Sequence, residues 1–304
     1  MPARAERRIG GETLGGLVAG LAAVQFGIVV VLGRFARRHG LPVSAMLSVR
    51  FAIGAMLLTI LLLALHRPLI APRGERSSLA SLALFGYAIE SFFFFAALGH
   101  GTVAAVTLLF FTYPVIVTIG SWALGRGRPG RSTVMALLCA LAGSAIVVSS
   151  GAGVEIRTLG VVLALASAVT YSAYLVGADS LLRRTDPLTS AMWVSAGASL
   201  GLFLSANAVG AWRLPAGQEW WPLVGMGLAS GGAFLCLMEG IRRIGAVRTA
   251  IVSAMEPLAA AVLAWVFLGE TITLGLAVGG CLILAAAVTA TLSGALTTRE
   301  QQIP

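Results

Sequence analysis

The sequence contains no lysine, and only 11% of its 304 residues are charged. A soluble domain needs about 25% charged residues to cover its surface. This scarcity of charge, together with a hydrophobic fraction of 58%, excludes an ordinary water-soluble enzyme and predicts a surface that faces lipid. Without lysine the chain also cannot form a phosphate-binding Gly-Lys loop, so we do not expect it to hydrolyse a nucleotide directly.

Cysteine and histidine are also scarce. Cys139, Cys236 and Cys281 are far apart within apolar runs, so we expect small buried apolar side chains rather than a disulfide framework. The three histidines stand at the ends of apolar runs and never at the spacing of metal ligands. The sequence therefore predicts no metal, no cofactor and no catalytic residues.

Long apolar runs make up most of the chain. A helix needs about 20 apolar residues to cross the hydrocarbon core of a bilayer. Ten such runs follow one another, and their connectors are too short to form a separate soluble domain. The predicted membrane-spanning helices cover residues 14–33, 43–65, 78–98, 103–123, 132–150, 158–178, 187–209, 220–239, 246–268 and 272–293.

The arginines between the runs predict the orientation. With the N-terminus inside, fifteen arginines fall on the inner side and five on the outer side, and Arg50 lies within the second run. Cytoplasmic loops are enriched in basic residues. We therefore expect a multi-pass protein of the inner (plasma) membrane with both termini in the cytoplasm. The same bias explains the net charge of +9 without a nucleic-acid partner. The outer cluster of Arg34, Arg37 and Arg38 is either a solvated loop or a positive outer vestibule.

The chain is predicted to consist of two related halves, residues 1–151 and 152–304. Several landmarks recur at an offset of about 144 residues, which indicates an internal repeat. A unit of five spans is odd, so its copy must insert upside down, and inverted repeats are typical of secondary transporters. We therefore predict an all-α integral membrane protein with ten transmembrane helices, arranged as two inverted five-helix repeats. Among the recurring landmarks are Pro114 with Pro257, Trp122 with Trp265, and Leu124-Gly125 with Leu268-Gly269.

Three segments resemble a known family. Residues 245–270, GAVRTAIVSAMEPLAAAVLAWVFLGE, combine small residues, a proline in mid-helix and a final Leu-Gly-Glu. Residues 102–125, TVAAVTLLFFTYPVIVTIGSWALG, are the copy in the first half, and Arg50 lies in SVRFAIGA of the second run. The chain resembles the drug/metabolite transporter superfamily, in its EamA-type ten-helix branch.

This resemblance implies two inverted five-helix repeats around a central cavity. It also implies transport of small metabolites, often export, without ATP. One departure from the family pattern concerns Arg126, which stands where the first repeat usually has the Glu of Leu-Gly-Glu. The function of that Glu is therefore present once in this chain, at Glu270.

Glu256 is the first candidate for substrate binding. An ionisable side chain in the hydrocarbon region costs about 2.5–3.5 kcal/mol, so Glu256 needs a partner or a wet cavity. Pro257 removes a backbone hydrogen bond, and such breaks persist where they line a cavity. Because Tyr113-Pro114 is the repeat partner of Glu256-Pro257, we expect a carboxylate and a phenol to meet at the cavity centre. A structural polar contact between helices is the alternative.

Arg50 and Glu90 are the next candidates. They either form a buried ion pair, or Arg50 binds a substrate carboxylate while Glu90 binds an amine or a proton. A zwitterionic substrate would satisfy both charges, so amino-acid-like compounds are the favoured cargo. Proton coupling is a further hypothesis, and it predicts that Glu256→Gln abolishes the response to a pH gradient.

Tyr171, Tyr174 and Gln25 complete the candidate site. The two tyrosines are three residues apart and so share one helix face. By the repeat, Gln25 corresponds to position 169, one turn from the tyrosines. These residues would supply hydrogen bonds and aromatic walls to a cavity, and ordinary helix packing is the alternative.

Other charged residues are assigned structural roles. Asp179 and Asp186 are expected to neutralise the two arginines at 183–184 between them. Glu239 is expected to form an ion pair with the arginines at 242–243.

The favoured function is a secondary transporter that exports amino-acid-like metabolites by alternating access. The alternatives are an exporter of organic cations and, with less support, a membrane enzyme. A channel would show a ring of charges or a filter loop, and neither occurs in the sequence. The expected partners are a small-molecule substrate and the lipid bilayer. A homodimer is also considered, with the Gly279-Gly280 stretch as its face by analogy.

Overall fold

A computed structural model describes residues 2–38, 41–149, 156–208, 210, 212–269, 271 and 273–300. Glu270 and His39 lie outside the described residues, as do the side chains of Arg34, Arg37 and Arg38. The predictions made for these residues therefore stay predictions.

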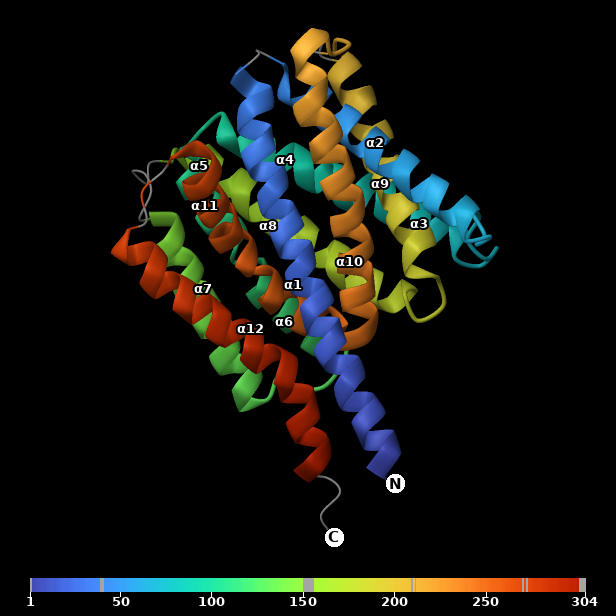
Figure 1. The fold of residues 1–304 in the computed structure, drawn as a ribbon, viewed down its shortest axis with the longest axis vertical. Helices are drawn as coiled ribbons and strands as arrows, with labels where there is room; N and C mark the ends of the chain where they lie inside the picture. Colours follow the sequence, from blue (N-terminus) through green and yellow to red (C-terminus); the bar gives the residue numbers. More distant parts are fainter. Residues whose placement is uncertain are drawn as a thin grey trace.

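The fold is all-α, as predicted from the apolar runs (Figure 1). Across the described residues, extended pairing is limited to an isolated bridge between Gly101 and Ile156. The helices are α1 (Pro2–Arg38), α2 (Val43–Ala64), α3 (Arg76–Ser81), the π-helix η1 (Leu82–Tyr87), α4 (Ala88–Leu98), α5 (Val103–Phe110), α6 (Tyr113–Ala123), α7 (Arg131–Ser149), α8 (Thr158–Leu181), α9 (Pro187–Ala208), the 3-10 turn η2 (Gly217–Glu219), α10 (Trp220–Ser253), α11 (Met255–Leu268) and α12 (Leu274–Glu300).

The helical segments are long and apolar enough to cross a bilayer. Nine candidate spans of at least 18 residues occur in the described chain, and a shorter apolar helix covers Met255–Phe267. Large apolar side chains also point outward, with Leu17 exposed by 67% and Phe267 by 66%. Such side chains would destabilise a surface in water, whereas they match the acyl chains of a lipid bilayer.

The eighth and ninth predicted spans are joined in the structure. The helix α10 runs from Trp220 to Ser253 without the connector expected before residue 246. Within it, Gly245 has φ of 79° and ψ of 165°, a conformation open to glycine but costly for other residues. The two spans are therefore separated by a kink at a single glycine. The hydropathy pattern predicts a boundary between two spans here, but it does not predict the kink.

Two helices are broken next to a proline, at equivalent places in the two halves. The first break separates α5 from α6 just before Tyr113-Pro114, and the second separates α10 from α11 just before Glu256-Pro257. Because proline has no N–H and clashes with the preceding turn, both breaks follow from the sequence.

The glycines after these broken helices also match. Gly125 follows α6 with φ of 73°, and Gly269 caps α11 with φ of 69°. A left-handed glycine is a common way to end an α-helix. The shared break and the shared glycine end support the prediction that the halves are related.

Small residues set the closest helix contacts. The helices α7 and α12 lie side by side (Figure 1), and a Cβ atom on Gly143 or Gly279 would lie 2.7 Å from the other's carbonyl oxygen. Gly280 packs against Leu258 of α11 in the same way. The Gly279-Gly280 stretch thus packs against α7 and α11 within this chain, and a homodimer through this part of α12 stays a prediction.

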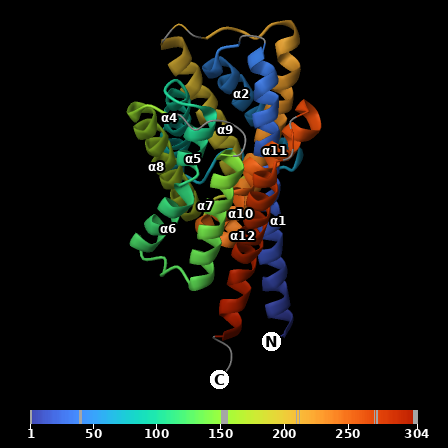
Figure 2. The same cartoon turned by 90° about the vertical axis from the view of Figure 1, so that its left-hand side faces the viewer.

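The helices α1 and α10 pack along their length in opposite directions. Gly15 lies against Ile244, Gln25 against Gly232, and Leu32 against Gly225. Both termini lie at the same end of the molecule (Figure 2), as expected for an even number of spans.

The cysteines are all free, and they differ in exposure. Cys139 and Cys236 are half-buried, whereas Cys281 is exposed on α12. The expectation of a buried side chain is wrong for Cys281, because its position on α12 faces outward from the bundle.

Candidate substrate site

All four tyrosines of the chain meet in one buried cluster. Tyr171 lies 4.8 Å from Tyr113, 5.8 Å from Tyr174 and 6.2 Å from Tyr87, measured between ring centroids. None of the four is more than 8% exposed. They come from η1, α6 and α8, so the cluster joins both halves of the chain. Tyr113, Tyr171 and Tyr174 were predicted from the sequence, and Tyr87 was not.

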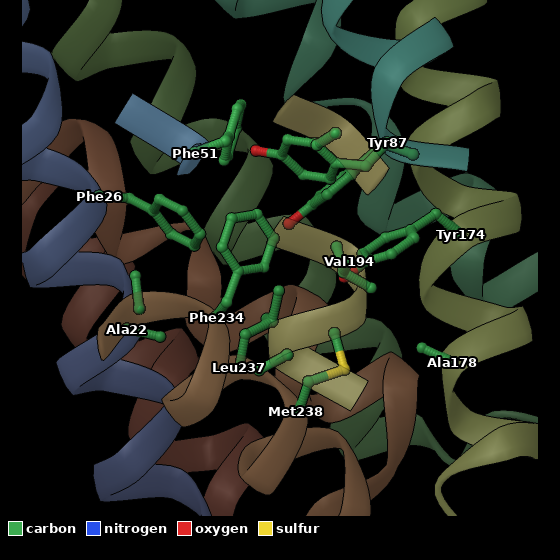
Figure 3. Packing of buried hydrophobic residues seen from close by; sticks show 14 of the residues in the cluster. Ala22, Phe26, Phe51, Tyr87, Tyr174, Ala178, Val194, Phe234, Leu237 and Met238 are labelled. Carbon is green, nitrogen blue, oxygen red and sulfur yellow. The ribbon is translucent and has the colours of Figure 1, made fainter. Parts of the chain in front are cut away.

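Tyr87 connects the tyrosines to a group of phenylalanines. Its ring lies 4.9 Å from Phe234, 5.4 Å from Phe51 and 5.5 Å from Tyr174 between centroids, each in an edge-to-face arrangement. Figure 3 shows these rings together with Phe26, which packs against Phe234 at 5.6 Å. Tyr87 ends the π-helix η1, and short π-helical turns are frequent at functional sites.

Tyr113 reaches across to the broken helix of the other half. Its hydroxyl donates to the carbonyl oxygen of Ala250 at 3.3 Å. That carbonyl is accessible because the N–H of Ala254 bonds to Ile251, at 3.2 Å, rather than to Ala250 four residues earlier. The two broken helices are therefore joined by a hydrogen bond, in line with the predicted meeting of the two proline motifs.

Glu256 lies beside this contact in the first turn of α11. It is near enough to Tyr113 and Arg50 to interact with them electrostatically. The N-terminus of a helix favours a negative charge. Over the described residues, no hydrogen bond or ion pair to the protein engages the Glu256 carboxylate, which is half-buried. Glu256 is thus a carboxylate held inside the bundle with capacity to bind a further group.

Glu90 is satisfied by hydroxyl groups. Ser91 Oγ donates to Glu90 Oε2 at 3.0 Å, and Ser167 Oγ donates to Oε1 at 3.1 Å. The residue is 5% exposed, on α4 where it packs against α8. These two hydrogen bonds lower the cost of burying the carboxylate without neutralising it.

Arg50 interacts electrostatically with both carboxylates and packs against an aromatic ring. Its guanidinium carbon is 4.2 Å from the centroid of the Phe51 ring, and the side chain interacts with Tyr87. Arg50 and Glu90 do not form a direct ion pair within 4.0 Å in this part of the structure, although their charges interact. Arg50 Nε is buried and has no hydrogen-bond partner. The Nε–H group of Arg50 can therefore still donate a hydrogen bond to a bound molecule.

Comparison with known proteins identifies the family of this chain. The model of the EamA-like transporter family matches residues 13–149 and, a second time, residues 158–292. The chain belongs to the EamA-like transporter family. The resemblance to the drug/metabolite transporter superfamily is thereby confirmed, since this family is part of it.

The related proteins agree with this assignment. The chain is 30% identical over 186 residues to "Uncharacterized transporter sll1319" of Synechocystis sp., covering 59% of this chain and 55% of that protein. It is 27% identical to "Uncharacterized transporter YwfM" of Bacillus subtilis, covering 65% of this chain and 69% of that protein. The match to the Synechocystis protein thus spans about half of its length.

A solved crystal structure has the same fold. It superposes on this EamA-like transporter with a TM-score of 0.80 at 22% identity, covering 95% of this chain and 99% of that chain. At this identity the likeness concerns the fold alone. Together with the apolar helices, the family assigns this chain as a multi-pass membrane transporter.

Gln25 lies at the edge of the transporter's aromatic cluster. It lies in α1, one residue before Phe26, and packs against Gly232, where an added Cβ would be 3.0 Å from the Gln25 amide. Its Oε1 is buried without a hydrogen-bond partner, and so is the hydroxyl of Tyr174. Buried polar atoms without partners are rare in folded proteins, and those at a site are candidates for ligand contacts.

The charged residues at the termini end of the transporter differ from prediction. Asp179 pairs with Arg126 at 2.5 Å, and Asp186 pairs with Arg67 at 2.6 Å. The direct ion pairs therefore differ from the predicted ones, because both carboxylates face other segments. Asp179 still interacts electrostatically with Arg183, as predicted. Glu239 does pair with the arginines at 242–243, at 2.7 and 2.5 Å, as predicted.

Proposed function

We propose that this EamA-like transporter exports small amino-acid-like metabolites by alternating access through the site around Glu256. The observation that carries the proposal is the combination of Arg50 and Glu256, two opposite charges that interact within one buried aromatic cluster. A zwitterion can place its carboxylate toward Arg50 and its ammonium group toward Glu256. Arg50 and Glu256 would then replace the water that the two charged groups of the cargo lose on entering the bundle.

The tyrosines fit the remaining surface of such a cargo. The unpartnered hydroxyl of Tyr174 can donate to a carboxylate or accept from an ammonium group. Aromatic faces attract a cation within about 6 Å of the ring centroid. The cluster would therefore bind both the charged and the apolar parts of an amino-acid-like compound.

The charge balance of the site supports proton coupling. Arg50 provides one positive charge, whereas Glu90 and Glu256 provide two negative charges. A neutral zwitterion leaves this sum unchanged, so one carboxyl group must take up a proton for the loaded site to be neutral in the membrane. Glu256 suits this role better than Glu90, since hydroxyl groups already hold Glu90 as an acceptor.

The two helix breaks offer places where the halves can move. We propose that the halves are inverted repeats and that both termini lie in the cytoplasm, at the arginine-rich end. The hydrogen bond from Tyr113 to Ala250 would then form and break as the halves rock against each other.

An exporter of organic cations is the second candidate. The excess of one carboxylate over Arg50, together with four tyrosines, favours a cargo with an amine and no carboxylate. In that case Arg50 would be a structural residue that balances the two glutamates.

Reconstitution in liposomes distinguishes these functions. We would measure uptake of labelled amino acids, an anionic amino-acid conjugate and an organic cation, with and without an inward proton gradient. The proposal expects saturable uptake of an amino-acid-like compound that a gradient accelerates and that Glu256→Gln or Arg50→Ala abolishes. The control is Asp186→Asn, which retains the capping of α9 and lies outside the site.

The other results have clear meanings. Uptake of the cation alone, dependent on Glu90 or Glu256, would replace the amino-acid proposal with the second candidate. Uptake that survives both substitutions would show that these charges are structural and that the cargo binds elsewhere.

A further inference from the structure

A basic cavity opens at the termini end of the bundle. It has a volume of about 1070 Å³ and lies between the α6–α7 connection, the end of α8 and the middle of α10. Its walls include seven arginines and the single carboxylate of Asp179. Arg248 in its wall pairs with Glu12 near the start of α1, which places the cavity near the N-terminus. We call this space the basic vestibule.

The arginines of the basic vestibule exceed their acidic partners. Asp179, Glu75, Glu239 and Glu12 pair with five of the seven arginines. Four carboxylates against seven guanidinium groups leave an excess of three positive charges. Arg128 and Arg183 are both exposed, and neither forms an ion pair within 4.0 Å in the described structure. Arg183 interacts electrostatically with Asp179 without a direct ion pair, so both guanidinium groups keep N–H donors for a ligand in the same cavity.

A buried hydroxyl group in the wall points to the same ligand chemistry. Ser121 lines the basic vestibule, is 5% exposed, and its Oγ has no hydrogen-bond partner. Thr118, one turn deeper in α6, is satisfied because it donates to the Pro114 carbonyl at 2.7 Å. A hydroxyl without a partner, in the wall of the same cavity as these two guanidinium groups, is suited to donate to an anion.

The vestibule lies along the same helix as the candidate substrate site. Ser121 and Tyr113 are eight residues apart on α6, which corresponds to about 12 Å of helix rise. Arg126 and Asp179 form an ion pair at the vestibule wall, and Asp179 also accepts from the backbone of Ala246 beside the Gly245 kink. The vestibule thus borders the Gly245 kink and lies about 12 Å along α6 from the helix break at Tyr113.

We propose that the basic vestibule is a second binding site, which takes a small anionic group, a carboxylate or a phosphate, between Arg128, Arg183 and Ser121. Two sources share this chemistry, a soluble metabolite and the headgroup of an anionic lipid. One role of this site rests on the proposed function: the vestibule collects carboxylate-bearing cargo before the cargo moves to the site around Tyr113 and Glu256. The anion site itself does not depend on that function.

The test measures anion binding to the purified full chain in a neutral detergent. Succinate and inorganic phosphate are titrated at constant ionic strength, with chloride as the reference, and the midpoint of thermal unfolding is followed. We expect a saturable rise for the wild type and a Kd at least about tenfold higher for Arg128→Gln/Arg183→Gln. Ser121→Ala should weaken binding without removing it.

The control removes the same charge elsewhere. Arg73→Gln/Arg157→Gln replaces two exposed arginines outside the vestibule and should bind both anions as the wild type does. An equal response of the wild type and both double variants would overturn the proposal, because the effect would then be non-specific. A wild type that responds neither to the soluble anions nor to phosphatidylglycerol in nanodiscs would overturn it as well.

A second arm identifies the source of the anion. The same variants are compared in nanodiscs of zwitterionic lipid with and without phosphatidylglycerol. If the lipid alone stabilises the wild type and the vestibule variant loses this effect, the site is supported with a lipid headgroup as its ligand. Glu256→Gln should keep anion binding, so a failed substrate proposal and a failed vestibule proposal give different results.

Discussion

Arg126 Nη1 lies 2.5 Å from Asp179 Oδ2, in a contact that joins the first half of the chain to the second. The same guanidinium donates to the Val176 carbonyl at 3.1 Å and to Ser180 Oγ at 2.5 Å. Arg126 therefore binds the last turn of α8, where the C-terminal end of the helix favours a positive charge. This contact explains how an arginine is accommodated where the family usually has a glutamate.

Replacing Arg126 by glutamate should destabilise the protein. The substitution puts two carboxylates together and leaves the Val176 carbonyl without its donor, so we expect a loss of about 1–3 kcal/mol in the free energy of unfolding. Thermal unfolding in detergent measures the loss. The double variant Arg126→Glu/Asp179→Arg should recover part of it, and additive losses would show that the pair is not coupled. Arg73→Glu is the control, since Arg73 is exposed and forms no ion pair within 4.0 Å among the described residues.

Arg50→Gln should change which compounds are transported. Gln keeps a hydrogen-bond donor but loses the positive charge, so the affinity for carboxylate-bearing cargo should fall about tenfold or more. Compounds with an amine alone should bind as well as before, or better, because the repelling charge is gone. Uptake competition between a labelled amino acid and its decarboxylated amine measures this ratio. An unchanged ratio would mean that Arg50 does not contact the cargo.

Tyr174→Phe should raise stability while it lowers transport. The hydroxyl of Tyr174 is buried without a partner, so its removal should stabilise the empty protein by about 1 kcal/mol. Tyr113→Phe is the comparison, since it removes the bond to Ala250 and should cost about 0.5–1.5 kcal/mol. Thermal unfolding and liposome uptake are measured on both variants. Faster transport by Tyr174→Phe would contradict a role for this hydroxyl in cargo binding.

Gly143→Ala should disrupt the packing of α7 on α12. The added methyl group would lie 2.7 Å from the Gly279 carbonyl oxygen, so backbone has to shift, at a cost of about 1–3 kcal/mol. Gly120→Ala is the matched control in α6, because nothing lies within 4 Å of its added Cβ atom. That change should be neutral or stabilise the helix by about 0.5–1 kcal/mol. An equal loss of stability in both variants would show that the effect arises within each helix and not from the contact between α7 and α12.

The broad features of the fold were predictable from the sequence because lipid imposes a simple pattern. Apolar runs of sufficient length predicted the spans, and the repeated prolines predicted the helix breaks at Tyr113-Pro114 and Glu256-Pro257. The kink at Gly245 was recognised only as a boundary between runs. A single glycine with positive φ leaves no mark in hydropathy, although it changes the direction of the chain.

The candidate site was predictable only in part. Charged groups and prolines stand out in an apolar chain, which is how Glu256, Arg50 and Glu90 were found. Tyr87 was missed because a tyrosine in an apolar run resembles ordinary core packing, although it lies one helical turn from Glu90. The direct ion pairs of Asp179 and Asp186 depend on which segments meet in space, and adjacency in the sequence could not predict them.

The gathering of every tyrosine in one place gives this protein a built-in spectroscopic probe. The chain has four tyrosines, and all four lie in the cluster beside Glu256. Biosynthetic incorporation of fluorotyrosine would therefore place every ¹⁹F nucleus at the site and none elsewhere. Four resonances would report directly on local changes when a cargo, a proton or an anion binds, without any engineered label.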